Sequence, residues 1–509
     1  MAKLFQLNFL DRNAAYPHHS HITRIVPYLL VIAAAVLGVI LVDSNNLKLV
    51  VIVIVGVMGI FVVASPPILL WLSIFGGIVV AGVARLYTPG LQQIRWMVAV
   101  TATCLFVHVL LNIASKISAD KFRYLSSIVF WSLVFVVLTI VSSILNKTDT
   151  NSLIIGLKGY FQSWGILFAL ALLTWSPKLL NAIPTALIWI ALVQLPFVLH
   201  QYLFIVPNRV GLGDGIVPVD IVSGTFGGDI FGGGMNAVLS AYLFVALSIS
   251  LAWWRKGVIQ TKLMVVLSVA LLTPVFLNEA KISVVYMVVV FFVVYRKDFI
   301  TRPIRFIGIT LGMLVVLVAL LTSYTAHIEN TKVNTIEDLA KFTYEYNFGK
   351  SQTFNDKLSR GGAIEYWAKQ HGMQDVVGTL IGHGVGASRI ESDRNSVVEF
   401  NTINPELGIG RIAIIAVLWD SGVIGLLALC VIFWTAFRTA GRLSNEIDDP
   451  RISSLCLGLQ GAIAVIFVSL WHKNFFVYQI GYQTILVIVL GYLAYWDKWL
   501  GNRRDSISS

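Results

Sequence analysis

Residues 303–323 read PIRFIGITLGMLVVLVALLTS, and the character of the chain changes where this stretch ends. The stretch holds one charged residue, Arg305, and matches the roughly 20 apolar residues that a helix needs to cross a bilayer. From residue 323 to residue 410, charged, aromatic and glycine residues crowd together, whereas apolar runs follow one another on both sides. This pattern predicts a chain that crosses a membrane many times and keeps one large polar loop.

The composition supports the same interpretation. The 509 residues are 57% hydrophobic and 12% charged, and the mean hydropathy is +0.80. A soluble domain has about 25% charged residues. The net charge of +11 comes from 37 basic and 26 acidic residues, and most of the basic excess lies in short segments next to apolar runs. This placement is typical of membrane orientation rather than of nucleic-acid binding, so no nucleic acid is expected as a partner.

The apolar runs predict an all-α fold, a polytopic membrane helix bundle with about 12–14 transmembrane helices and one large, partly helical periplasmic loop. The two weakest candidates, 159–175 and 282–296, are short. The fourteen candidates lie at 25–42, 47–63, 67–84, 95–114, 126–145, 159–175, 181–205, 235–255, 260–278, 282–296, 303–323, 411–436, 454–472 and 478–497.

Basic residues follow alternate candidate spans, which orients the chain by the positive-inside rule. Lys147 and Lys158 are the exceptions. We expect both termini in the cytoplasm of a bacterial cell, the spans in its inner membrane, and no removable signal peptide. The expected organisation is a cytoplasmic tail at 1–24, transmembrane helices over 25–322 with a Gly-rich periplasmic loop at 207–234, the large periplasmic loop at 323–410, transmembrane helices at 411–497 and a cytoplasmic tail at 498–509.

Two outward-facing segments near the membrane carry charges that could meet an anionic headgroup. The Gly-rich loop contains Arg209 and nine glycines between residues 211 and 234, so it is either a flexible connector or a re-entrant loop beside a lipid-headgroup cavity. Lys281 lies between two candidate spans, where it either snorkels to the interface or contacts phosphate.

The large loop contains a candidate functional residue, His383, in the segment GHGVG at 382–386. A histidine between glycines is not typical of a packed core, because glycine offers little to pack against. His383 is therefore either functional or part of an ordinary turn, and His327 and His371 have less weight. Arginine can bind phosphate bidentately, and the loop region contains Arg360, Arg389, Arg394 and Arg411. We see no metal-ligand spacing and expect neither a metal nor a cofactor.

Several short motifs follow one another between residues 207 and 427. They are SGTFG at 223–227 with MNA at 235–237, NEAKIS at 278–283, Arg360 and Trp367 followed by GHGVG, and WDSGVIG at 419–425. In this order they resemble the O-antigen polymerase and O-antigen ligase superfamily of bacterial membrane glycosyltransferases. The resemblance implies a GT-C-like helix bundle that works at the periplasmic face.

The resemblance also implies a chemistry. Family members transfer a glycan from an undecaprenyl-pyrophosphate carrier to an acceptor hydroxyl without a metal; arginines hold the pyrophosphate, and a base, often a histidine of the large loop, activates the acceptor. Here His383 would be the base. Arg209, Lys281 and Arg360 would contact the pyrophosphate, with Arg389 and Arg411 behind them. The implied partners are the lipid-linked donor, a glycan or lipid-linked acceptor and membrane lipids, and there is room for a regulator of chain length.

The departures from the family pattern favour a polymerase over a ligase. Ile221 and Val222 stand where the family has an arginine before GTF, and Lys281 stands at the second arginine position. The His-Asn pair that commonly follows the glycine segment is absent. The leading hypothesis is a polysaccharide polymerase that extends a lipid-linked repeat unit, such as an O-antigen or exopolysaccharide. The alternatives are an O-antigen ligase acting on lipid A-core or another terminal acceptor, and a lipid-linked oligosaccharide flippase or secondary transporter, which should carry ionisable residues in its spans.

Overall fold

The computed structural model describes residues 59, 63–88, 93–117, 125–210, 212, 217–326, 336–349, 358–388 and 409–508. The expected span at 25–42 and most of that at 47–63 lie outside these residues, so they remain predictions. Apart from an isolated bridge between Gly228 and Gly234, the regular structure of the described part is helical. The predicted all-α class is therefore confirmed.

Ten helices in the described part are long and apolar enough to cross a membrane, or eleven if a bent pair is counted as one span. The chain is a multi-pass membrane protein, as the sequence predicts. The ten are α3–α4 (Pro66–Phe75 and Ala81–Tyr87, joined by a π-turn), α5 (Arg95–Ile117), α6 (Ser127–Leu145), α9 (Pro177–His200, extended to Asn208), α10 (Asn236–Arg255), α11 (Thr261–Asn278), α14 (Pro303–Ala326), α18 (Ala413–Glu446), α19 (Pro450–His472) and α21 (Ile480–Ser508).

Within the described residues, the two weakest candidates form no simple span. At 159–175 the chain forms α7 (Thr150–Phe161) and α8 (Trp164–Leu172), which meet at a bend of 53°. At 282–296 it forms α12 (Ser283–Tyr295), whose 13 residues reach only about 20 Å against a hydrocarbon thickness of about 30 Å. Further short elements are α13 (Asp298–Thr301), α20 (Phe475–Tyr478), η6 (Pro218–Ile221), η7 (Gly224–Phe226) and η9 (Ile409–Arg411).

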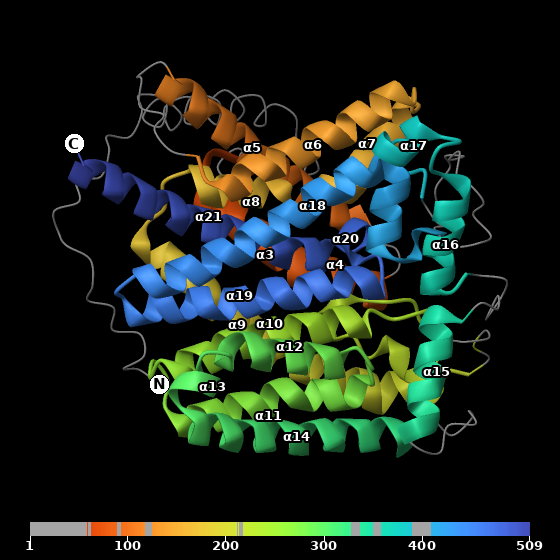
Figure 1. Cartoon of the computed structure of the whole chain (residues 1–509), viewed down its shortest axis with the longest axis vertical. Coiled ribbons are helices and arrows are strands. Elements are labelled where there is room, and N and C mark those ends of the chain that lie inside the picture. The colour runs from red at the N-terminus through yellow and green to blue at the C-terminus, as the bar shows by residue number, and fades with distance from the viewer. Residues whose placement is uncertain are drawn as a thin grey trace, which may run out of the picture.

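The spans run side by side, and three further helices lie across one end of them (Figure 1). These are α15 (Ile336–Phe348), α16 (Arg360–Gln370) and α17 (Val376–Ile381), and we call their side of the bundle the loop end. The Gly-rich loop lies at the same end, because Gln479, just before α21, donates to the carbonyl of Phe226 at 2.8 Å. Within the bundle α21 is almost wholly covered, whereas α14 packs on the outside and leaves most of its apolar side chains uncovered.

The centre of the loop end is a break in α18. Gly422 has φ 68°, which L side chains rarely adopt, and the helix kinks there. A Cβ on Gly422 would lie 2.3 Å from the carbonyl oxygen of Leu380, and a Cβ on Gly382 would lie 2.5 Å from the backbone nitrogen of Ser421. The two glycines therefore let the loop after α17 touch the backbone of α18 directly.

We expect Gly422→Ala to destabilise the protein. The positive φ alone costs about 1–3 kcal/mol for a residue with a Cβ, and the contact with Leu380 adds to this. The measurement is the melting temperature of the detergent-solubilised protein, which should fall by several degrees. Gly308→Ala in α14 is the matched control, because its Cβ would meet nothing within 4 Å and the change should leave the melting temperature equal or higher. Equal melting curves for the two variants would contradict the tight contact.

Candidate functional site

His383 is held in place by the broken helix. Its backbone N–H donates to the carbonyl of Trp419 at 2.8 Å, and the N–H of Gly384 donates to the carbonyl of Asp420 at 3.0 Å. The carboxylate of Asp420 then accepts hydrogen bonds from Tyr160 at 2.7 Å and from the backbone and hydroxyl of Ser388 at 2.8 and 3.1 Å. The segment around His383 is thus fixed at both of its ends.

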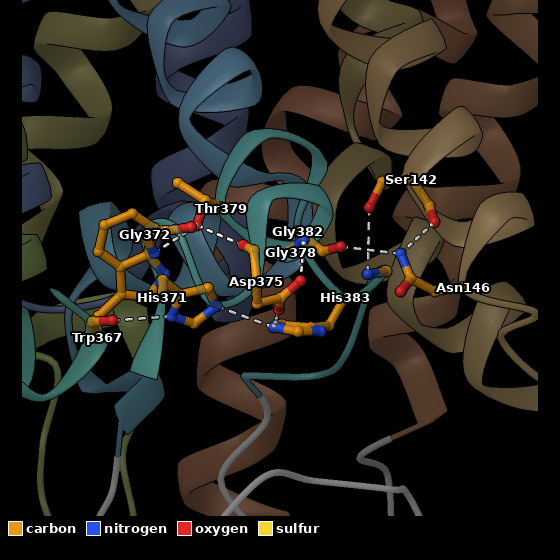
Figure 2. Close-up of polar contacts among 11 residues, drawn as sticks. Ser142, Asn146, Trp367, His371, Gly372, Asp375, Gly378, Thr379, Gly382 and His383 are labelled. Atoms are coloured by element: carbon orange, nitrogen blue, oxygen red, sulfur yellow. Dashed lines mark hydrogen bonds and ion pairs between the residues drawn. The ribbon is translucent and has the colours of Figure 1, made fainter. Parts of the chain in front are cut away.

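The imidazole of His383 belongs to a cluster with His371 and Asp375 (Figure 2). The Nε2 atoms of the two histidines are 2.9 Å apart, and Oδ2 of Asp375 lies 3.7 Å from Nε2 of His383. Nδ1 of His371 lies 2.8 Å from the carbonyl oxygen of Trp367, and since a carbonyl only accepts, the proton of a neutral His371 is on Nδ1. Burial and the neighbouring His371 lower the pKa of His383, while Asp375 opposes the shift.

Arg360 contributes to a second polar group at the loop end. Its Nε donates to the carbonyl of His472 at 2.8 Å, one terminal nitrogen lies 3.2 Å from Nδ1 of His472, and the other donates to the side chain of Asn347. A guanidinium only donates, so Nδ1 of His472 accepts, and a neutral His472 carries its proton on Nε2.

Arg411 lies beside this group. The backbone N–H of Asn474 donates to the carbonyl of Arg411 at 2.8 Å, and the amide of Asn474 donates to Gly410 at 2.9 Å. The segment 472–474, which joins α19 to α20, therefore touches both Arg360 and the turn that carries the exposed Arg411. Together these residues form what we call the basic group: Arg360, Arg411, His472 and Lys473.

Arg209 has a structural task in the described structure. Its guanidinium donates to four backbone carbonyls, and its side chain is buried. The acceptors are Ile230 at 2.8 Å, Val217 at 3.2 Å, Pro218 at 2.5 Å and Gly232 at 2.6 Å. These bonds tie the carbonyls of residues 217, 218, 230 and 232 together, which favours an ordered arrangement of this described part of the loop over a flexible connector. A phosphate would have to displace them, so the geometry does not favour Arg209 as a pyrophosphate contact.

The other residues predicted to contact pyrophosphate lie in the turn before α12 or outside the described residues. Lys281 lies in the turn between α11 and α12, where burial lowers its pKa and the negative charges of Glu279 and Asp220 raise it. Lys281 therefore has acidic neighbours that reduce its attraction for an anion. Arg389 and Arg394 lie outside the described residues, as does His327.

The histidine cluster and the basic group lie at opposite ends of α16. Arg360 is the first residue of this helix and His371 follows its last. Its 11 residues span about 16 Å at a rise of about 1.5 Å per residue. The structure thus brings Arg360 and Arg411 into one neighbourhood and gives His383 a separate one. The role of His383 as a base stays a prediction.

Sequence reasoning missed His472 and Lys473. They directly follow a long apolar run, which is a signal for polar residues at a membrane boundary, but only the fold brings them to Arg360. No protein-family model and no curated protein matches this chain. The resemblance to the O-antigen superfamily therefore rests on the motifs quoted above.

We expect Arg209→Lys to loosen the Gly-rich loop, because a lysine ammonium cannot reach four carbonyls at once and each charged hydrogen bond contributes about 1.5–3 kcal/mol. Hydrogen exchange of residues 217–232 in the solubilised protein should become faster than in the wild type. Arg302→Lys, an exposed arginine next to α14, is the control and should leave this exchange unchanged. Unaltered exchange in Arg209→Lys would show that the clamp does not hold the loop.

Proposed function

We propose that the protein is a membrane glycosyltransferase of the polysaccharide polymerase type. It would transfer a glycan from an undecaprenyl-pyrophosphate carrier to a hydroxyl of a lipid-linked acceptor at the periplasmic face. The observation that carries the proposal is the basic group, which gathers Arg360, Arg411, His472 and Lys473 from three separate parts of the chain. The order of the motifs quoted above resembles that of a family with undecaprenyl-pyrophosphate-linked donors, and this resemblance supports the choice of donor.

The position of the basic group suits a lipid-linked anion. Span α19 ends at His472, and span α18 begins at Ala413, two residues after Arg411. The charges therefore lie at the boundary between the spans and the loop end. A polyprenyl carrier places its tail in hydrocarbon and its pyrophosphate at this boundary, so both parts of such a donor meet a matching environment.

The chemistry of the basic group suits a pyrophosphate leaving group. Negative charge builds up on the departing phosphate oxygen in the transition state, and cations or N–H donors fixed before the reaction stabilise it. Arg360 is held by His472 and Asn347, and the Nε2–H of His472 is a further donor. In this proposal Arg360, Arg411 and Lys473 neutralise the negative charge of the leaving group.

A transporter is less well supported. A transporter should carry an ionisable residue inside its spans, and Asp420 is the main candidate for this role near the loop end. Its carboxylate is buried and already accepts hydrogen bonds from Tyr160 and Ser388. These contacts give Asp420 the task of fixing the loop segment to α18.

We expect Arg360→Lys to lower the yield of long-chain glycan by about a hundredfold or more, because removing one transition-state donor costs that much in comparable sites. The lysine keeps one positive charge but loses the fork that holds His472 and Asn347. The measurement is complementation of a strain that displays the polysaccharide and lacks this gene, with glycan length read on a gel and membrane-inserted protein quantified. Arg302→Ala is the control and should complement fully.

The deletion strain itself separates the functions. Single repeat units on the terminal acceptor indicate a polymerase. Long chains that remain on the undecaprenyl carrier indicate a ligase and would overturn the polymerase assignment. Lipid-linked units that accumulate at the cytoplasmic face indicate a flippase and would overturn the proposal, as would full complementation by Arg360→Lys.

A further inference from the structure

We propose that His371, Asp375 and His383 form a binding site for a divalent transition-metal ion, with Zn²⁺ as the best match. One ligand atom from each residue is available, and all three lie within 4.8 Å of one another. This inference goes beyond the proposed function, which depends on the basic group at the other end of α16.

The donor atoms suit such an ion. Zn²⁺ binds imidazole nitrogen and carboxylate oxygen at about 2.0–2.2 Å, so two ligands of one tetrahedral ion lie about 3.3–3.5 Å apart. The distances here are 2.9 Å between the two Nε2 atoms and 3.7 Å between Nε2 of His383 and Oδ2 of Asp375. The two distances lie on either side of this range, so small side-chain movements would place these atoms around one ion. Two imidazoles and one carboxylate favour zinc or a similar ion over magnesium or calcium.

The atoms around the cluster orient the ligands as in known metal sites. Nδ1 of His371 donates to the carbonyl of Trp367, which leaves the lone pair of its Nε2 directed at the cluster. Oδ1 of Asp375 accepts from the backbone N–H of Gly378 at 2.8 Å, which leaves Oδ2 for an ion. Figure 2 shows His371, Asp375 and His383 turned toward one another.

The backbone leaves room for this arrangement. A Cβ on Gly378 would lie 2.0 Å from Oδ2 of Asp375 and 2.8 Å from Cε1 of His383, so only glycine fits beneath the cluster. The indole of Trp419 packs against both rings, with centroids 4.7 Å from His371 and 5.6 Å from His383. Three ligands are thus held on a rigid support before an ion binds.

The site would be open on one side. The side chain of Asp375 is 39% exposed and that of His383 is 26% exposed, whereas His371 is buried. Three protein ligands and an accessible fourth position are the pattern of zinc sites that keep a water or a substrate oxygen. In this assignment His383 is a metal ligand, and the ion would fasten the end of α16 to the segment that follows α17.

The test uses the full-length protein without a polyhistidine tag, solubilised in detergent, treated with a chelator and then titrated with Zn²⁺ or Co²⁺. We expect one ion per chain by elemental analysis, a Co²⁺ absorption spectrum typical of four-coordinate nitrogen and oxygen ligands, and a higher melting temperature with Zn²⁺. Asp375→Asn should weaken binding at least about tenfold, and His383→Asn should abolish it. Asparagine at 375 keeps an oxygen for the N–H of Gly378, so α17 should still form.

His200→Gln is the matched control, since this histidine contacts Tyr87 and lies outside the cluster. It should bind one ion like the wild type. Wild-type protein that takes up no ion, or variants at 375 and 383 that bind as tightly as the wild type, would overturn the proposal. Because ion binding is read without any transfer reaction, failure here is distinct from failure of the proposed function.

Discussion

The structure of the loop end depends on the need to satisfy backbone polar groups inside a membrane protein. An unbroken helix would pair the carbonyls of Trp419 and Asp420 with N–H groups four residues further on, and the break at Gly422 removes that possibility. In hydrocarbon each unpaired group would cost several kcal/mol. The N–H groups of His383 and Gly384 take the vacant positions, and Ser142 adds a third donor. The loop is therefore hydrogen-bonded to the broken helix, and separating the two would leave these backbone groups unpaired.

The positions of the two polar groups follow from this bonding. Once the segment after α17 is fixed to α18, α16 has to lie across the end of the bundle (Figure 1). Its last turn brings His371 to His383, and its first residue, Arg360, reaches the end of α19 at His472. A single helix of 11 residues thus separates a basic group from a histidine cluster by about 16 Å.

Much of the fold was accessible from the sequence, because membrane spans are a local property. Hydropathy identified the ten spans, and shortness correctly marked the bent pair α7–α8 and the short α12. The candidate site was accessible only in part. Arg360 and His472 are 112 residues apart, and no local pattern indicates that one will donate to the other. The sequence does not indicate the structural role of Arg209 either, because its acceptors are backbone carbonyls whose positions depend on the folded loop.

The contacts of the His383 ring bear on whether it acts as a general base or as a metal ligand. A general base must turn a lone pair toward the acceptor hydroxyl. In a pair without an ion, Nε2 of His371 accepts, so His383 donates from Nε2 and keeps only Nδ1 for proton transfer. With an ion, both Nε2 lone pairs and the carboxylate of Asp375 face one charge. A carboxylate beside two imidazoles is the charge pattern of a cation site, and the glycine beneath it leaves the space that such a site needs. At the start of α16, guanidinium and ammonium groups would then bind the leaving phosphate. At its end, about 16 Å away, a metal ion would bind an oxygen ligand.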